Sequence, residues 1–452
     1  MSTPAGTVDA APGGTVDAGR GGTVDAAPGG TGDAVPGGTG DAVPGGTGDA
    51  VPGGASGPAP LRTDGPMPAG TDGPAPAGVF PGGAELFRLD ARVAHLNHGS
   101  FGAVPLPVAR EHRRIADEAA ADPDAFFLGV PDRLAAARAR VAAHFGTDPE
   151  GMALVTNATE AAHLALDALG LGPDDEVLVT DHGYGTVVEA AARRARLVTV
   201  PLDPLLPDED AVREAVLAAV TPRTRVAVLD QITSPTARIV AGPRLLADLA
   251  DRGVTTVVDG AHAPGMLAAP LAGRPDVWFG NLHKWAYAPP GSAVLAVAPA
   301  LRDRVPSPVP SWEDHRGFPR AVEYRGTADY TGLLAAADGL DLLATLGAER
   351  VRAHNSALAA HGAGLLAKLP GVTPLPADDR LALRALRLPS RFARTRPEAE
   401  ALREEIMVRV GCRVLVWPWP GGGGIRICGQ IYNRPAEYER LARGLRSLLD
   451  GD

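Results

Sequence analysis

The sequence predicts an α/β protein in which a mostly parallel sheet carries helices on both faces and a smaller α+β domain follows. Between residues 150 and 300, short runs of apolar and β-branched residues alternate with longer helical patterns. This βαβα order is typical of a parallel sheet. Beyond residue 331 helical patterns dominate and only short strand-like runs remain. A chain of 452 residues is long enough for one large and one small domain.

The first segment, residues 1–84, is expected to be a disordered tail. Residues 29–36, 37–44 and 45–52 all read Gly-Gly-Thr-Gly-Asp-Ala-Val-Pro, and looser copies precede them. Such a segment has almost no large apolar side chains with which to offset the entropy of ordering. A calcium-binding solenoid would need regular apolar positions in each repeat, which this segment lacks. A partner-binding tail is the other alternative.

The large domain is expected over residues 85–330, with residues 85–125 forming an N-terminal segment near the functional site. Its strand-like runs are 153–156, 176–180, 197–200, 225–229, 254–258 and 292–297, and its helical stretches include 133–145, 160–169 and 243–252. In parallel sheets ligands bind at the carboxyl ends of the strands. Four polar residues stand directly after such runs, namely Asn157, Asp181, Asp230 and Asp259.

The smaller C-terminal domain is expected over residues 331–452. Short strands are expected near 413–416 and 425–428, between long helical patterns. Arg426 lies on the second of these strands, just after a run of glycines. An arginine there can clamp a carboxylate with two parallel hydrogen bonds. An arginine on the surface of a strand is the more ordinary interpretation of this position alone.

Composition argues against several kinds of partner and location. The chain is 45% hydrophobic and 21% charged, with a formal net charge of −10. This mild acidity gives no reason to expect nucleic acid or an anionic membrane as a partner. No apolar run approaches a membrane span, and the N-terminus lacks the apolar core of a signal peptide. Cys412 and Cys428 are the only cysteines, too few for a disulfide framework. We expect a cytoplasmic protein without a metal site.

Lys284 is the most informative single residue. It is one of only two lysines, with Lys368, in a chain that otherwise uses arginine. A primary amine condenses with an aldehyde to form a Schiff base, which a guanidinium cannot do. Asp259 ends a β-branched run upstream, and an aspartate can pair with a protonated pyridine nitrogen. Together they predict a pyridoxal 5′-phosphate (PLP) site, although a surface lysine is the simpler alternative.

Other residues could complete this site, and each also has an ordinary structural explanation. Asn157, Ala158 and Thr159 follow a strand and open a helix, where backbone N–H groups suit a phosphate. Asn and Thr are also common helix caps. Tyr184 could stack on a planar cofactor or be a loop or core ring. His262 could bond the phenolic oxygen of the cofactor or be a structural histidine.

Six sequence blocks occur in the order that is typical of one enzyme family. They are 96–102 (Leu-Asn-His-Gly-Ser-Phe-Gly), 156–159 (Thr-Asn-Ala-Thr), 257–265 (Val-Val-Asp-Gly-Ala-His-Ala-Pro-Gly), 283–285 (His-Lys-Trp), 325–329 (Arg-Gly-Thr-Ala-Asp) and 426–428 (Arg-Ile-Cys) followed by Tyr432 and Asn433. The chain resembles the class V aminotransferase family of fold type I PLP enzymes, and within it the isopenicillin N epimerase-like branch. The resemblance runs from about residue 90 to 450. It implies an enzyme that acts at the α-carbon of an amino acid.

The resemblance also implies roles for individual residues. Lys284 would bind the aldehyde carbon of PLP and act as acid and base at the substrate α-carbon, and Asp259 would pair with the pyridine nitrogen. Arg426 matches the arginine that binds the substrate carboxylate, and Asn97 lies in a loop on the substrate side. The remaining positions match cofactor contacts: Tyr184 against the ring, His262 and Ser234 near the ring oxygen, and Ala158, Thr159, Asn281 and His283 at the phosphate. Thr327 matches a phosphate contact donated by the partner subunit, which implies a homodimer.

The reaction stays open at this point. Epimerisation, transamination and loss of a β or γ group all begin with removal of the α-proton. Three positions depart from the usual pattern of the family and bear on the substrate: Cys428 replaces a usual serine, Ala237 stands where glycine is common, and Pro290 stands where Arg or Thr is frequent.

Two further alternatives belong to other classes of function. A cysteine desulfurase needs a nucleophilic cysteine on a mobile loop, and Cys412 is the only candidate. It begins an expected buried strand, and buried free cysteines are usually inert. A non-catalytic binding protein on the same scaffold is the other alternative. Retention of both Asp259 and Lys284 argues against it.

Overall fold

The computed structural model describes residues 78–419 and 421–451. Residues 1–84 are expected to be a disordered tail, and residues 1–77 of this segment lie outside the described part of the chain. Phe80 is buried, with its ring edge-on to His354 at a centroid distance of 5.2 Å and below the guanidinium of Arg350. The packed part of the chain thus begins before the boundary expected near residue 85.

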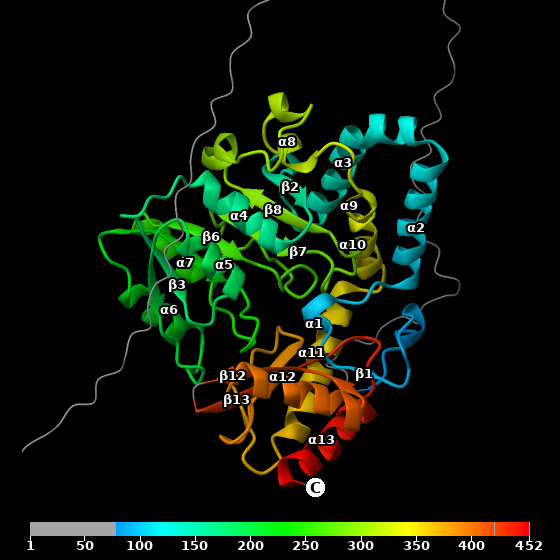
Figure 1. The fold of residues 1–452 in the computed structure, drawn as a ribbon, viewed down its shortest axis with the longest axis vertical. Coiled ribbons are helices and arrows are strands. Elements are labelled where there is room, and N and C mark those ends of the chain that lie inside the picture. The colour runs from blue at the N-terminus through cyan, green and yellow to red at the C-terminus, as the bar shows by residue number, and fades with distance from the viewer. Residues whose placement is uncertain (1–77, 420, 452) are drawn as a thin grey trace, which may run out of the picture. The chain divides into compact units, whose positions relative to one another are not determined.

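A seven-stranded sheet forms the centre of the large domain (Figure 1). Its strands, in spatial order, are β2 (Met152–Val155), β8 (Ala293–Val297), β7 (Val277–Asn281), β6 (Thr255–Asp259), β5 (Thr224–Asp230), β3 (Glu176–Thr180) and β4 (Arg196–Val200). From β7 to β4 all neighbours are parallel, whereas β8 is antiparallel to both β7 and β2. The predicted α/β fold with a mostly parallel sheet is confirmed. The run predicted at 292–297 is the antiparallel strand, and β7 was not predicted.

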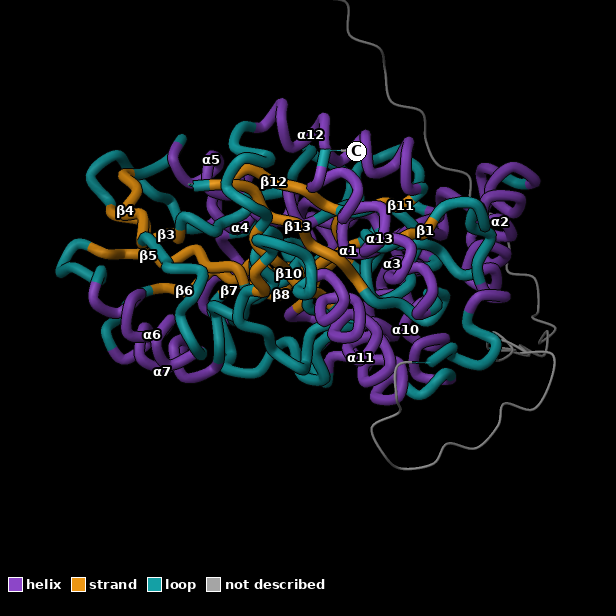
Figure 2. The backbone as a smooth tube through the Cα atoms, turned by 90° about the horizontal axis from the view of Figure 1, so that it is seen from below, coloured by secondary structure: helices purple, strands orange, loops and turns teal. Residues whose placement is uncertain are grey.

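Successive side chains of the strands face two separate apolar cores. On β3, Leu178 belongs to one core, and Val177 and Val179 belong to the other. The first core is covered by α3 (Pro123–Phe145), α6 (Glu209–Ala218), α7 (Pro243–Asp251) and α10 (Ala336–Thr345), and the second by α4 (Ala158–Ala168) and α5 (Gly185–Ala192). Figure 2 shows α6 and α7 on one side of the strands and α5 on the other. Because both faces are covered, these strands are apolar almost throughout.

Local signals in the sequence set the helix ends. Asp122 accepts the Ala125 N–H at 3.1 Å and Pro123 occupies the first turn of α3, which ends at Gly146 with a φ of 61°. Asn157 caps α4 by accepting the Glu160 N–H at 2.9 Å. Since α4 follows β2 directly, its N-terminus stands at the edge of the sheet where the parallel strands end.

The C-terminal domain contains a four-stranded antiparallel sheet with the order β12 (Leu415–Trp419), β13 (Gly422–Cys428), β10 (Leu383–Arg387) and β9 (Thr373–Pro374). Residues of α11 (Ala348–Leu366), α12 (Arg396–Glu405) and α13 (Pro435–Asp450) form its apolar core, to which the strand pair β1 (Ala94–His95) and β11 (Cys412–Arg413) adds residues. Leu333 and Leu340 still belong to the core of the large sheet. The C-terminal core therefore starts in α11, later than the boundary expected at residue 331.

The remaining short elements connect these layers. They are α1 (His98–Phe101), α2 (Leu106–Ala121), α8 (Arg320–Glu323), α9 (Thr331–Leu334), the 3-10 turns Ala84–Leu86, Pro149–Gly151, Pro299–Arg304 and Asp314–Arg316, and a π-helical turn, Ile406–Val410. In the described part of the chain no single helix is long and apolar enough to cross a membrane. Only a bent pair, Thr331–Thr345 with Ala348–Leu366 at 81°, meets that test jointly.

Candidate active site

A cavity of about 190 Å³ lies where β5, β6 and β7 end and α4 begins. All the residues predicted for the site line this cavity, except Asn97, Thr327 and Arg426. Ser100 and Phe101 of the N-terminal segment also line it. The strand ends, the helix start and the N-terminal segment thus meet at one place.

The Lys284 amine is buried in this cavity and lies 3.4 Å from His262 Nε2. Burial lowers the pKa of Lys284 from 10.5 to about 8, and the positive charge of Arg426 adds to this effect. Asp259 acts in the opposite direction. A lysine with this pKa is partly unprotonated near neutral pH and can act as a nucleophile or a base.

His262 presents a proton to the cavity. The indole Nε1 of Trp285 donates to His262 Nδ1 at 3.4 Å. Because an indole N–H only donates, Nδ1 must accept and the ring proton resides on Nε2. Burial holds the pKa of His262 well below its usual value, so the imidazole is neutral. Its Nε2–H is therefore available to an oxygen atom placed beside Lys284.

Two carboxyl groups share one wall of the cavity. Asp259 ends β6, accepts the Ala261 N–H at 2.9 Å, and has its pKa raised to about 6 by burial. Asp230 ends the neighbouring strand β5, pairs in register with Asp259 and also lines the cavity. Asp230 was not predicted as a site residue. Its place directly after a strand was the signal that could have identified it.

The N-terminus of α4 is partly occupied by the protein itself. Asn281 Oδ1 accepts the Ala158 N–H at 2.9 Å, so this predicted phosphate donor is bonded within the structure. The hydroxyl of Thr159 lines the cavity and has no hydrogen-bond partner among the described residues. His283 Nδ1 lies 3.1 Å from the Ser292 carbonyl oxygen, which leaves Nε2 for a ligand. Thr159 and His283 are therefore the groups at this helix start that can reach an anion.

Arg426 is a buried cation with neutral partners. It lies on β13, is fully buried, and donates to Asn97 Oδ1 at 3.1 Å, Ser100 Oγ at 3.3 Å and Ser234 Oγ at 3.1 Å, as well as to the Ser234 carbonyl oxygen. No carboxylate of the described residues bonds it. Because Ser100 and Ser234 line the cavity, the guanidinium stands directly behind the cavity wall. A buried guanidinium without an acidic partner suits an incoming carboxylate.

His98 is a further residue to which the sequence analysis assigned no role. Its Nε2 lies 2.9 Å from the carbonyl oxygen of Lys284, and its Nδ1 lies 3.1 Å from the Tyr432 hydroxyl. A carbonyl oxygen only accepts, so Nε2 carries the proton and Nδ1 accepts from Tyr432. His98 therefore holds the backbone of Lys284 in place. Only the tertiary contacts show this, because nothing in the local pattern marks it.

Thr327 and Cys412, the candidate nucleophile of the desulfurase alternative, lie away from the cavity. Thr327 is exposed and does not line the cavity of its own chain. Cys412 is buried in the C-terminal core, where burial raises the pKa of its thiol. A buried thiol of this kind is a poor nucleophile. The structure therefore does not favour the desulfurase alternative.

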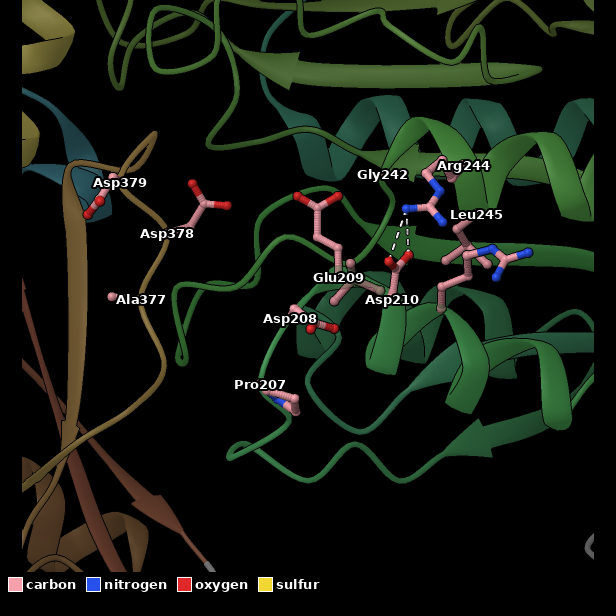
Figure 3. Close-up of a pocket in the computed structure, with 12 residues that line it drawn as sticks. Pro207, Asp208, Glu209, Asp210, Gly242, Arg244, Leu245, Ala377, Asp378 and Asp379 are labelled. Carbon is pink, nitrogen blue, oxygen red and sulfur yellow. Dashed lines mark hydrogen bonds and ion pairs between the residues drawn. The ribbon is translucent and has the colours of Figure 1, made fainter.

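A larger hollow, of about 500 Å³, lies between the starts of α6 and α7 and the loop 377–379 (Figure 3). Five of its twelve lining residues are acidic and two are arginines. Asp210 faces Arg244 at 2.8 Å, and Arg380 bonds both Glu209 and Asp378. Its lining contains no lysine, histidine or cysteine. The smaller cavity around Lys284 is thus the better candidate for chemistry.

Comparisons with known proteins agree with this site. Residues 130–441 match the family model described as Aminotransferase class-V. The chain belongs to this family. It is similar to isopenicillin N epimerase of Streptomyces clavuligerus, with 34% identity over 80% of this chain and 96% of that protein. It is also similar to putative L-cysteine desulfhydrase 1 of Oryza sativa subsp. japonica, with 27% identity over 81% of this chain and 85% of that protein.

A solved structure shares the fold. The cysteine desulfurase CsdA from Escherichia coli superposes with a TM-score of 0.66 at 20% identity, covering 81% of this chain and 97% of that one. The class V aminotransferase resemblance, with its isopenicillin N epimerase-like branch, is thereby confirmed. So is the prediction of a PLP-dependent enzyme of fold type I.

Proposed function

We propose that this protein acts at the α-carbon of an amino acid and that its reaction is epimerisation. One observation carries the proposal: the Lys284 amine and the Asp259 carboxyl group face one cavity, and the guanidinium of Arg426, which no carboxylate of the described residues bonds, stands behind its wall. These are the groups needed to bind an aldehyde, a pyridine nitrogen and a substrate carboxylate. The similarity to isopenicillin N epimerase supports epimerisation among the reactions that begin this way.

The residues that line the cavity support a PLP site. When bound, PLP supplies an electron sink conjugated with the substrate α-carbon. Asp259 would hold the protonated ring nitrogen, and the Nε2–H of His262 would bond the ring oxygen. Thr159 and His283 would hold the phosphate at the start of α4. The ring of Tyr184, about half exposed at the cavity, is placed to cover the plane of the cofactor.

The substrate would be held from the opposite side. Arg426 would bind the α-carboxylate, which replaces the neutral oxygens of Asn97 and Ser234 as its partner. The Lys284 amine, with its pKa near 8, would remove the α-proton and return one. Epimerisation requires that the proton returns to the other face of the α-carbon.

C–S bond cleavage is the second candidate, because the rice relative is named as a putative L-cysteine desulfhydrase. It needs the same groups up to removal of the α-proton and then releases a sulfur substituent from the β-carbon. The two reactions leave different products. Epimerisation in D₂O exchanges the α-hydrogen and keeps the rest of the substrate intact, whereas hydrolytic C–S cleavage of L-cysteine releases sulfide, ammonia and pyruvate.

Two experiments test the proposal. Borohydride reduction followed by peptide mass mapping should find the cofactor attached to Lys284, and attachment to Lys368 alone would refute the site. Incubation with a panel of amino acids and sulfur-substituted amino acids in D₂O should then give α-deuterated products of both configurations, resolved by chiral chromatography. Release of sulfide without inversion would favour the second candidate.

We also propose that the enzyme is a homodimer with shared active sites. Thr327 is exposed and outside its own cavity, and Phe101 at the cavity is 81% exposed. A second subunit would cover this apolar ring and bring Thr327 of the partner subunit to the phosphate. Mixed Lys284→Ala and Thr327→Ala subunits should then regain activity, because one site of each heterodimer carries neither change. With exchange of subunits verified, no recovery would refute the shared site.

A cytoplasmic location belongs to the same proposal. Cys412 and Cys428 are both free and buried, which suits a reducing compartment. Cell fractionation with activity and antibody detection checks it.

A further inference from the structure

Asp230 is a buried carboxyl group to which the proposed chemistry gives no role. It is the last residue of β5, only 6% exposed, and it lines the cavity. It pairs in register with Asp259, the last residue of the parallel strand β6. Neighbouring strands lie about 4.8 Å apart, and paired residues of parallel strands point to the same side. The two carboxyl groups therefore stand side by side in the cavity wall.

The loop between β3 and α5 packs against the same edge of the sheet and offers Asp230 one contact. A Cβ added to Gly183 of this loop would lie 3.6 Å from Asp230 Oδ2, and the backbone of the next residue, Tyr184, lowers the pKa of Asp230. The other titratable groups of this loop bond elsewhere: His182 Nδ1 lies 3.0 Å from the Thr236 hydroxyl, and Asp181 accepts the Leu202 N–H at 2.9 Å. This loop therefore brings no charge to Asp230.

One cation acts on the pair. The positive charge of Lys284, which follows β7, favours the ionised forms of both Asp230 and Asp259. Among the residues that the structure describes, no arginine or lysine forms an ion pair with either carboxyl group. Two neighbouring buried carboxylates with a single amine nearby cannot both ionise without a large electrostatic penalty, so the pair shares one proton.

The proton belongs on Asp230. Burial and the neighbouring Asp259 raise the pKa of Asp230 well above its ordinary value, whereas the pKa of Asp259 is raised to about 6. At neutral pH Asp259 is thus the ionised member, which is the form that a protonated pyridine nitrogen needs.

We propose that Asp230 is a positioning residue of the PLP site, a neutral acid that donates its O–H to the Asp259 carboxylate while it accepts the Tyr184 N–H. This rests on the proposed function, since it places the ring nitrogen at Asp259. The donated bond favours the ionised form of Asp259 and orients it. The accepted bond holds the start of α5 and with it the Tyr184 ring. One side chain thereby positions groups at the edge and at the face of the cofactor.

Two variants of similar size separate this role from its alternatives. In Asp230→Asn the amide N–H can donate to Asp259 and the amide oxygen can accept from Tyr184, as the neutral acid does. In Asp230→Leu both bonds are lost, while the number and branching of the side-chain heavy atoms are kept. The measurements are the affinity for PLP and the ¹⁵N chemical shift of PLP labelled at the ring nitrogen, followed from mildly acid to mildly alkaline pH. Circular dichroism and gel filtration establish that both variants are folded.

The Asn variant should retain PLP affinity within about threefold and keep the ring nitrogen protonated across the pH range. The Leu variant should bind PLP about 10- to 100-fold more weakly, with a ring nitrogen that loses its proton as the pH rises. Equal damage in both variants would show that Asp230 acts as an ionised carboxylate, and an unchanged Leu variant would show that it only fills space. Either result overturns the proposal. If the Leu variant fails to fold, Asp230→Ser, which is too short to reach Asp259, takes its place with the same expected result.

Borohydride reduction of the same samples tests the cofactor site separately from the role of Asp230. Cofactor trapped on Lys284 in all three proteins would support the cofactor site on which the proposed function depends, whatever the PLP affinities of the Asn and Leu variants are. Failure to trap it on Lys284 in the parent protein would refute the proposed function itself, before Asp230 is considered.

Discussion

Lys284→Met should abolish turnover and yet make the cofactor-free protein more stable. The Lys284 amine is almost completely buried, and burial together with the charge of Arg426 lowers its pKa from 10.5 to about 8. The folded protein therefore disfavours the charged amine relative to the unfolded chain. A methionine of similar length removes that charge and keeps the apolar contacts of the side chain.

The magnitude follows from the pKa difference. A shift from 10.5 to about 8 at about 1.4 kcal/mol per pH unit corresponds to about 3 kcal/mol at pH 7, because both the folded and the unfolded protein are then mostly protonated. As the pH rises from about 8 to 10.5 the unfolded chain still carries the proton that the folded protein has lost, and the difference shrinks. Near pH 10 it should be below about 1 kcal/mol.

Urea unfolding of the cofactor-free proteins at several pH values is the measurement. Lys368 is the only other lysine and is exposed, so Lys368→Met is the matched control and should change the free energy of unfolding by less than about 0.5 kcal/mol. If Lys284→Met gave no stabilisation at neutral pH, or the same stabilisation at every pH, the reasoning from a buried charged amine would be refuted.

Three further substitutions test other parts of the site. Arg426→Lys keeps the charge but loses the planar fork, so amino acids should bind more weakly by about 2 kcal/mol or more in equilibrium titrations, while simple amines are affected little; equal binding of amino acids would place the carboxylate site elsewhere. Cys412→Ala should leave turnover of every substrate unchanged in steady-state assays, because the thiol is buried in the C-terminal core; loss of turnover in a folded variant would restore the desulfurase alternative. Ala237 has a φ of 53°, so Ala237→Gly relieves left-handed backbone strain in the folded protein but makes the unfolded chain more flexible. Chemical denaturation should therefore show a net change in the free energy of unfolding below about 1 kcal/mol, and a destabilisation above about 2 kcal/mol would contradict this balance.

The fold was predictable where strands are continuous and β-branched, as in β5 and β6. The strand β7 escaped prediction because it contains Trp278 and Gly280, which interrupt the pattern. Gly280 is required by packing, since a Cβ there would lie 2.8 Å from the ring of Pro264. The antiparallel direction of β8 was not predicted for another reason. The residue pattern of a strand does not show whether it runs parallel or antiparallel to its neighbours. The connection from β7 to β8, residues 282–292, holds no crossover helix, which is what parallel pairing needs.

Site residues could be proposed from the sequence where the residue type itself indicates the chemistry. Lys284 stands out by rarity, and Asp259 by its place after a strand. Asp230 has the same place in the sequence, but its importance depends on the register between β5 and β6, which no single-strand pattern records. His98 depends on a contact with the Lys284 carbonyl across 186 positions of the chain. Such roles arise from tertiary structure and appear only once the chain is folded.

The scarcity of lysine makes the chain a simple target for amine chemistry. With the cofactor on Lys284, the exposed Lys368, two residues after α11, would be the only lysine side chain that an acylating reagent can reach. A dye or a solid support should therefore attach at one defined place in the C-terminal domain, apart from the α-amino group. Trypsin would cleave after arginine almost everywhere. Because the chain has only two lysines, few tryptic peptides contain one, and the peptide with Lys284 can be identified in a mass spectrum. An enzyme of this composition can thus be oriented on a surface without engineered tags, and its cofactor content can be read from a single peptide.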